Sequence, residues 1–282
     1  MKSAKSMLVL MCLCLFVASL ILIGQSSAAI DKKNVIGVWL LNDNGGTVAK
    51  DSSANKNDGT IKGKPKWIDG KFGKALQFDG ASSVDIDNPD NFDFTTWTYS
   101  FWFKASAGGD YPNLIGRQFS NTWGWTIHLD PARATFRIRI DSDGGINQLP
   151  TVAAKVADGE WHHGVICQDD SKKKQLTFYF DGIKGQGTYL GNYKPTGGFL
   201  TIAAPCVGAV AFNNGAIDDV AIFDTLLAED DILSIMDKGL EAAMPSVFAV
   251  SPEGRLVDTW GDLNHFDSNS RMGIAHPTST SC

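Results

Sequence analysis

The chain has 282 residues and a formal net charge of −6, and its lysines and arginines form no cluster. A nucleic-acid-binding protein needs a basic face that replaces counterions along the phosphates, so this charge pattern argues against a nucleic-acid partner. Hydrophobic residues make up 43% of the chain and charged residues 20%, which is typical of a globular domain and excludes a disordered one. The 29 glycines, 16 phenylalanines and 8 tryptophans favour short strands joined by tight turns.

The N-terminal segment has the pattern of a secretory signal peptide. Lys2 and Lys5 form a basic start, residues 7–24 are almost wholly apolar, and small residues follow. We expect cleavage after Ala28 or Ala29, which makes the mature protein secreted, periplasmic or cell-surface and leaves no membrane insertion. The apolar stretch is also near the length that spans a bilayer, so an uncleaved anchor is the alternative.

Three cysteines remain once the leader is removed, in a mature chain of net charge −8 because two lysines are lost from a total of −6. Export implies an oxidising compartment, where three thiols allow one bridge and one leftover. Cys167 and Cys206 both lie at the ends of predicted strands, and we expect a disulfide between them. The alternative for Cys167 is a small buried hydrophobic residue. Cys282, the last residue of a polar tail, is expected to be free or to pair between molecules.

Short strands separated by turn residues follow the leader. Residues 125–129 and 136–140 alternate apolar and polar side chains, as strands with one buried face do. This spacing predicts a sandwich or barrel and argues against helices that alternate with parallel strands. The expected strands cover residues 35–41, 75–78, 84–86, 99–104, 125–129, 136–140, 164–167, 176–180, 200–202 and 216–223.

One helix is expected after the last strand. Residues 229–236 place Ile232, Ile235 and Met236 on one stripe, acidic residues occupy the first turn, and Gly239 ends the helix. Apolar segments beyond it suit a small hairpin, and the polar tail after them is expected to be disordered. The predicted organisation is a signal peptide (1–29), one domain (34–240) and a C-terminal extension (241–282).

Seven short motifs occur in order along the predicted domain. They are residues 38–43 (VWLLND), 51–59 (DSSANKNDG), 73–80 (GKALQFDG), 99–104 (YSFWFK), 161–163 (WHH), 180–182 (FDG) and 217–223 (IDDVAIF). In this order they resemble the laminin-G-like (LamG-like jelly roll) family of the concanavalin A-like lectin/glucanase superfamily. The resemblance implies an all-β fold, a two-sheet antiparallel jelly-roll sandwich with one short C-terminal helix. The family usually has Ser before the acidic first turn of that helix; here Ala228 stands there, so a cap worth roughly 1 kcal/mol is absent.

A structural calcium ion is expected from oxygen-rich positions in two regions. Calcium takes several carboxylate, amide and carbonyl oxygens, usually from loops. The resemblance brings the loop at Asp51 and the strand at Asp218 together at the edge of the sandwich. The alternative is that the loop simply forms Asx turns. The expected ligands are Asp43, Asp51, Asn55, Asn57 and Asp218.

Two pairs of neighbouring residues invite a catalytic interpretation. His162 and His163 are adjacent on a strand, so their rings are expected on opposite faces, and no further ligands occur at zinc-site spacing. Asp218 and Asp219 are expected on opposite faces for the same reason, whereas a retaining glycosidase needs two carboxyl groups about 5–5.5 Å apart. No catalytic residue is therefore assigned, and the chain is expected not to be an enzyme.

Sugar binding needs exposed aromatic rings beside hydrogen-bonding groups. A loop-rich stretch provides such residues, with core-edge packing as the alternative for Trp123. Arg137 and Arg139 share the outward face of one strand, where a solvated face is the default expectation and contact with a carboxylate or sulfate is the alternative. The candidate ligand-binding residues are Tyr111, Arg117, Phe119 and Trp123.

The predicted function is an exported, non-catalytic binding module that presents loops on a rigid sandwich to a glycan or an extracellular protein ligand. The ligand part of this prediction depends on the likeness to the family, because a fold alone does not define function. One alternative is a structural or adhesion protein of the envelope that binds no small ligand. A less favoured alternative is a glycoside hydrolase.

Overall fold

The structure is a computed structural model. It describes residues 30–87, 92, 94–106, 112–119, 123–130, 135–142, 145–153, 156–169, 175–188, 198–204 and 211–249. The predicted signal peptide (1–29), Tyr111, Cys206, Cys282 and the extension beyond residue 249 lie outside these residues. Within the described ranges, no helix is long and apolar enough to cross a membrane.

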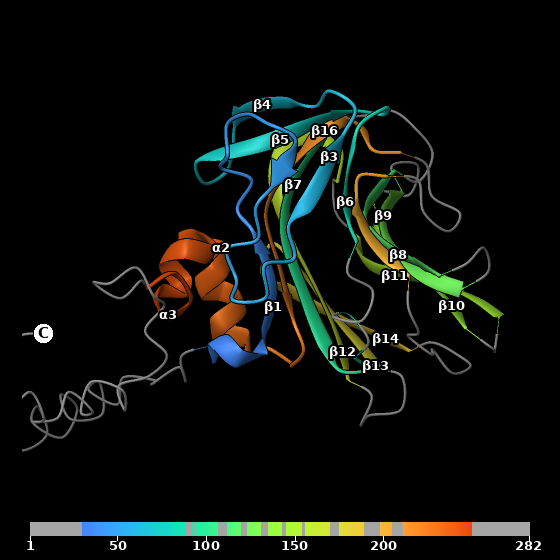
Figure 1. Ribbon diagram of the computed structural model, residues 1–282. Coiled ribbons are helices and arrows are strands. Elements are labelled where there is room, and N and C mark those ends of the chain that lie inside the picture. The colour runs from blue at the N-terminus through green and yellow to red at the C-terminus, as the bar shows by residue number, and fades with distance from the viewer. Residues whose placement is uncertain are drawn as a thin grey trace, which may run out of the picture.

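Two antiparallel sheets of eight strands each face one another, which confirms the predicted all-β, two-sheet sandwich (Figure 1). Sheet A has the strand order β14-β13-β12-β7-β16-β5-β4, and β1 also pairs with β16. Its strands are β1 (Val35–Trp39), β4 (Lys66–Asp69), β5 (Lys74–Asp79), β7 (Trp97–Ser106), β12 (Asp158–Asp169), β13 (Gln175–Phe180), β14 (Ile183–Thr188) and β16 (Asn213–Phe223).

Sheet B has the strand order β11-β10-β9-β8-β15-β6-β3-β2. Strands β8 to β11 are neighbours in chain order, but β15 lies between β8 and β6, as expected of a sandwich whose chain crosses between sheets. Its strands are β2 (Val48–Ala49), β3 (Gly59–Lys62), β6 (Ser83–Ile86), β8 (Asn113–Phe119), β9 (Trp123–Asp130), β10 (Thr135–Ser142), β11 (Gly145–Ala153) and β15 (Phe199–Ile202).

The core between the sheets follows from strand alternation. On β7, every second side chain (Trp97, Tyr99, Phe101 and Phe103) belongs to the main hydrophobic cluster. Trp97 stacks on Trp125 of β9 with ring centroids 5.6 Å apart. Aromatic rings of both sheets therefore meet face to face across the sandwich, and each such pair adds about 0.5–1.5 kcal/mol beyond the area it buries.

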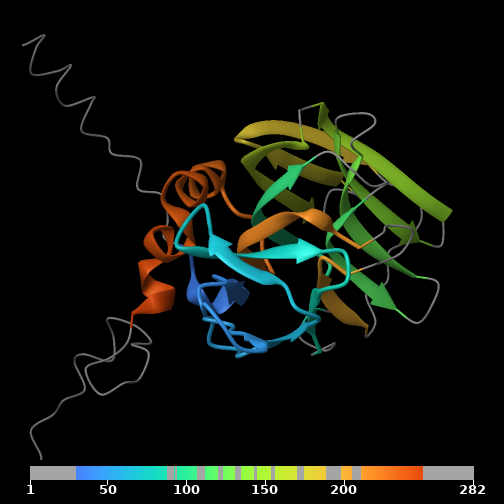
Figure 2. The same cartoon turned by 90° about the horizontal axis from the view of Figure 1, so that it is seen from above.

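Helices α2 (Glu229–Ala243) and α3 (Pro245–Phe248) pack on the outer side of sheet A, as Figure 1 and the view from above in Figure 2 show. Ile235 and Leu240 of α2 join a second apolar cluster with Val38 and Phe223. Ala228 makes no side-chain capping hydrogen bond, which confirms the missing cap.

Two details of this helical region differ from the sequence prediction. Gly239 takes φ +78°, yet helical structure resumes after it and continues to Ala243, so this glycine is a kink and not the end of the helix. The start of the predicted hairpin is helical instead, because Pro245 is pre-organised for a first helical turn and Val247 packs into the second cluster.

Cys167 is a free, buried thiol in the structure, and not a disulfide as we predicted. Its side chain packs with Val165, Tyr179 and Ile232 on the outer face of sheet A, and the Thr98 hydroxyl lies 3.6 Å from its sulfur. Cys206 comes after β15, which belongs to sheet B, whereas the side chain of Cys167 packs against Ile232 of α2. This agrees with the alternative of a small buried hydrophobic residue, and burial raises the pKa of the Cys167 thiol to about 11.

A side chain at position 239 should destabilise the fold. The Cβ of Gly239→Ala would lie 2.8 Å from the Phe72 ring, and the backbone at φ 78° and ψ 168° is in a region that costs an L residue roughly 1–3 kcal/mol. We expect a fall of at least about 2 kcal/mol in the free energy of unfolding, measured by denaturant titration. Gly159→Ala is the matched control: Gly159 has φ +87° but no atom within 4 Å of a Cβ, so it should show the backbone cost alone. Equal losses in the two variants would contradict close packing at Gly239.

Candidate functional site

The Asp51 carboxylate is the centre of a hydrogen-bond network beside β1. Its Oδ1 accepts from the backbone N–H groups of Val38 and Ser53, both at 2.8 Å. Its Oδ2 accepts from the Ser53 hydroxyl at 2.7 Å and from the Asn57 N–H at 2.8 Å. Four donors therefore point positive dipoles at this buried carboxylate, which is a fold-stabilising arrangement in which a charge is satisfied by hydrogen bonds.

The other predicted calcium ligands have their own partners. Asn55 and Asn57 donate from their side-chain amides to carbonyl oxygens of β1, and Asp43 accepts from the Lys50 N–H at 3.2 Å. Asp218 accepts three backbone N–H groups elsewhere. No three His, Cys, Asp or Glu side chains among the described residues are grouped to hold a metal ion. The predicted ligands thus do not fit a calcium site, because backbone N–H donors occupy all three predicted carboxylates, those of Asp43, Asp51 and Asp218.

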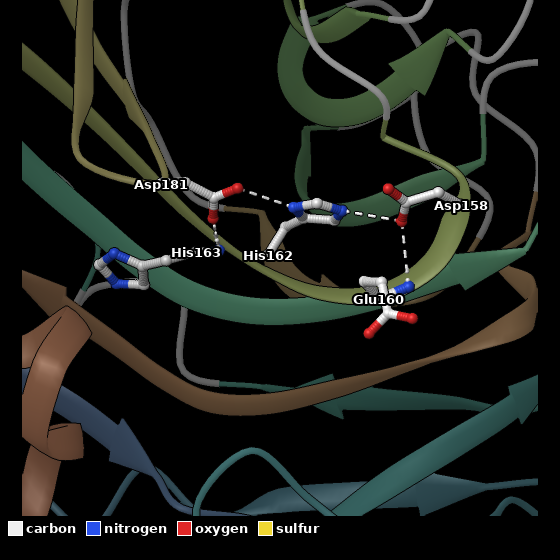
Figure 3. A network of polar contacts seen from close by, with 5 residues as sticks. All are labelled: Asp158, Glu160, His162, His163 and Asp181. Carbon is white, nitrogen blue, oxygen red and sulfur yellow. Dashed lines mark hydrogen bonds and ion pairs between the residues drawn. The ribbon is translucent and has the colours of Figure 1, made fainter.

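His162 lies between two carboxylates at the start of the long strand β12 (Figure 3). Its Nδ1 is 2.7 Å from Asp181 Oδ2, and its Nε2 is 3.0 Å from Asp158 Oδ1. The other oxygen of Asp181 accepts the His163 N–H at 2.8 Å. The hydrogen bond to Asp181, and secondarily that to Asp158, raises the pKa of His162 against the opposing effect of burial. The network ties β12 to the turn after β13.

His163 faces the opposite side of sheet A, as expected for neighbours on a strand. His162 stacks on Phe180 in the main cluster, whereas His163 lies 5.1 Å from the Trp102 ring on the outer face. The Nε2 of His163 is 2.9 Å from the Ser100 hydroxyl. Complete burial lowers its pKa to about 3, so the ring is neutral. The two histidines therefore share no ligand.

Asp218 and Asp219 do not point to opposite faces, in contrast to the sequence prediction. A β-bulge follows Asp218, and Asp219 takes φ +45°, which turns both carboxylates outward. Asp218 Oδ2 accepts the N–H groups of Lys71 (2.7 Å) and Phe72 (3.0 Å), and Asp219 Oδ2 accepts the Leu240 N–H at 3.0 Å. Burial raises the pKa of Asp218 to about 7 and that of Asp219 to about 6.

A second polar group lies on the outer face of sheet B, and we call it the sheet B polar face. On β9 the residues Trp125, Ile127 and Leu129 point into the core, so the alternate residues point outward. Register then places residues of β8 and β10 beside them: Asn113 and Arg137 both pair with His128. The sheet B polar face comprises Asn113, Thr126, His128, Asp130, Arg137 and Arg139.

Hydrogen bonds and one ion pair fix the sheet B polar face. Thr126 Oγ1 donates to Asn113 Oδ1, and Asn113 Nδ2 donates to the Ala204 carbonyl at 2.7 Å. Arg137 Nη1 lies 2.8 Å from Asp130 Oδ2 in a buried ion pair. Burial, with a contribution from the charge of Arg137, lowers the pKa of His128 to about 4. The face thus holds amide, hydroxyl, neutral imidazole and guanidinium groups in fixed positions; all of its residues are buried except Arg139, which is partly exposed.

The predicted sugar-binding residues have different fates. Arg117 is 1% exposed and faces the core, where its guanidinium donates to the Phe92 carbonyl, so it is not a surface residue as we predicted. Phe119 and Trp123 form a register pair at the ends of β8 and β9. Tyr111 lies outside the described residues. The outward-facing Arg137 is likewise not solvated, because Asp130 pairs with it. Strand alternation in the sequence predicts that Arg137 and Arg139 face outward, but it does not predict that β8 pairs with β9 and brings Asn113 beside them.

These observations define a class: a two-sheet antiparallel sandwich of the jelly-roll type with a polar, hydrogen-bonded outer face on one sheet. The chain belongs to the concanavalin A-like lectin/glucanase superfamily, since the Laminin_G_3 family model of that description matches residues 78–233. Comparison with curated proteins gives no match.

Several solved structures share the fold. Domain 4 of AbnA, a GH43 extracellular arabinanase from Geobacillus stearothermophilus solved in complex with arabinotriose, has a TM-score of 0.61 and 16% identity over 72% of this chain and 98% of that domain. The binding domain of Paraclostridial Mosquitocidal Protein 1 has a TM-score of 0.59 and 18% identity over 73% of this chain and 52% of that one.

The binding domain of botulinum neurotoxin DC, solved with rat synaptotagmin II, has a TM-score of 0.57 and 13% identity over 74% of this chain and 52% of that one. The chain therefore spans about half the length of these toxin binding domains. Identities this low show a common fold, and the similar structures are domains that bind carbohydrate or protein.

The His162 network should make stability depend on pH. A folded-state pKa above the unfolded value of about 6.5 means that His162 stabilises the fold fully below pH 6.5, and that this contribution is lost as pH rises through the folded pKa. We expect the difference in melting temperature between the wild type and His162→Gln to be largest near pH 6 and to shrink by pH 9. Asp158 has a lowered pKa, so its share is also lost in strong acid. A difference that grows from pH 6 to pH 9 would contradict the network.

Proposed function

We propose that this chain is an exported, non-catalytic binding module that recognises a carbohydrate on the sheet B polar face. The observation that carries the proposal is that Arg139, which is partly exposed, lies in register with Thr126 and beside a fixed, buried polar network of Asn113, Thr126, Asp130 and Arg137 on the outer side of a rigid sheet. Sugar recognition needs hydrogen-bonding groups whose orientation is set before the ligand arrives, because their ordering then costs no binding free energy.

The similar structures support this proposal. Domain 4 of AbnA, which this chain matches over 98% of that domain's length, was solved with arabinotriose. A botulinum neurotoxin DC binding domain was solved with a sialyl sugar and, separately, with synaptotagmin, so the same fold also holds domains with a protein ligand. Protein ligand recognition is therefore the second candidate, and an adhesion role without a small ligand is the third.

Arg139 is the residue of this face best suited to a test. It pairs in register with Thr126 and is only partly buried, so its removal should leave the core intact. We expect Arg139→Ala to weaken glycan binding by about tenfold, the usual scale for one lost charge-assisted hydrogen bond. A glycan array identifies the ligand, with arabinotriose included, and calorimetric titration of the full chain measures the affinity.

Lys66→Ala is the control for this titration, since it removes an exposed cation from β4 of sheet A and should bind like the wild type. Tyr111→Ala and Trp123→Ala test the aromatic part of the sequence prediction in the same titration. Glycan binding that survives Arg139→Ala, or no glycan binding at all, would overturn the proposed site. Hydrolysis of a glycan that is lost in Asp218→Asn would overturn the non-catalytic assignment.

Export is proposed from the leader of residues 1–29. When the full chain is produced with an export pathway, we expect the protein recovered outside the cytoplasm to begin at Ala29 or Ile30. N-terminal sequencing and intact mass measure this. Exported protein that still carries Met1 would favour the alternative of a retained anchor.

A further inference from the structure

Asp219 is a buried acid that forms no ion pair within the described part of the chain. The residue is 2% exposed, and its carboxylate accepts one hydrogen bond, from the Leu240 N–H. Among the described residues, no lysine, arginine or histidine forms an ion pair with it, and the charged neighbour that influences it is another acid, Glu241. A buried carboxylate without a counter-charge is costly, and a cation placed beside it recovers that cost.

A cleft of about 370 Å³ opens beside this carboxylate, at the kink of α2. Apolar residues (Leu40, Phe72 and Ala242) line it together with Asp219 and Gly239, and a Cβ built on Gly239 would lie 3.1 Å from Asp219 Oδ2. Asn42 and Glu241 add further oxygen atoms. A volume of this order suits a small ligand or one long side chain of a partner.

The lysines nearby do not compensate Asp219. Lys238 lines the cleft but is exposed and makes no ion pair in the described structure. The ammonium group of Lys71 lies over the Trp102 ring, 4.4 Å from its centroid. Asp218, the preceding residue, is a further acid, and its carboxylate accepts the backbone N–H groups of Lys71 and Phe72.

We infer that the cleft at the α2 kink binds an alkylammonium group, with Asp219 and Glu241 facing the charge and Leu40, Phe72 and Ala242 packing on the alkyl chain. The shared chemistry is a primary ammonium on a short aliphatic stem. A free amine or the lysine side chain of a partner protein supplies it equally. The cleft lies beside α2 on sheet A, whereas the proposed glycan site lies on sheet B. The two proposals can therefore be tested independently.

Titration of the full wild-type chain tests this inference directly. The probes are n-butylammonium chloride and Nα-acetyl-lysine methylamide, with n-butanol and Nα-acetyl-norleucine methylamide as their uncharged counterparts, followed by NMR shifts of Leu40, Phe72 and Ala242 signals. We expect saturable binding of at least one cation and at least tenfold weaker binding of its uncharged counterpart. The tighter of the two cations identifies the source. Absence of saturation by both cations, or equal binding of charged and uncharged probes, would overturn the inference.

Asp219→Asn separates the charge from the shape, because an amide oxygen can still accept the Leu240 N–H. We expect this variant to bind the cation at least tenfold more weakly, Glu241→Gln to bind it about threefold more weakly, and Asp69→Asn, which changes an exposed carboxylate of β4, to bind it unchanged. Unchanged binding in Asp219→Asn would overturn the assignment.

The pH dependence of the wild type keeps the test open if Asp219→Asn does not fold. The cation needs an ionised Asp219, and burial raises the pKa of that carboxyl to about 6. Binding of the butylammonium probe should therefore be about tenfold weaker at pH 5 than at pH 7.5, since protonation of the free protein competes with the ligand. An affinity that is the same at both pH values would contradict a role for Asp219.

Discussion

Strands β7 and β16 are buried on both faces, and this constraint determines most of what surrounds them. Their inner side chains are aromatic or aliphatic, but buried polar residues lie among those of the outer face and cannot reach water. Each must find a partner within the protein. Thr98 donates to the Thr225 carbonyl, Ser100 pairs with His163, and Asp218 accepts the N–H groups of Lys71 and Phe72. The loops and helix that cover sheet A are thus attached by the polar groups they bury.

The polar side chains on the two outer faces of the sandwich have different kinds of hydrogen-bond partner. On sheet A, polar side chains bond to the covering elements, and α2 and α3 add an apolar cluster beneath them. On sheet B, polar side chains bond mainly to one another across β8, β9 and β10. This buried network fixes the strands that carry the partly exposed Arg139, and a recognition residue requires such a rigid support. This difference places the proposed glycan site on sheet B.

The fold could be predicted because its signals are local. Alternation along 99–104, 125–129 and 136–140 gives the inner faces directly, and seven ordered motifs give the family. The geometry of the candidate sites could not be predicted from the sequence, because it depends on strand register and on β-bulges. Asp218 and Asp219 were predicted on opposite faces from regular alternation, which fails where one bulge residue takes a positive φ. Arg117 has the sequence context of a surface arginine, and only pairing with Trp125 and Leu200 places it inside.

The fold itself gives Asp219 little reason to be charged. Position 219 needs a residue that tolerates φ +45° and accepts the Leu240 N–H, and asparagine meets both needs without the desolvation cost of an ionised group. Asp51 is a useful contrast, because four donors satisfy its carboxylate and its charge is fully used by the fold. Asp219 has one donor, an acidic neighbour and an open cleft. The charge that folding leaves uncompensated is therefore available to a ligand.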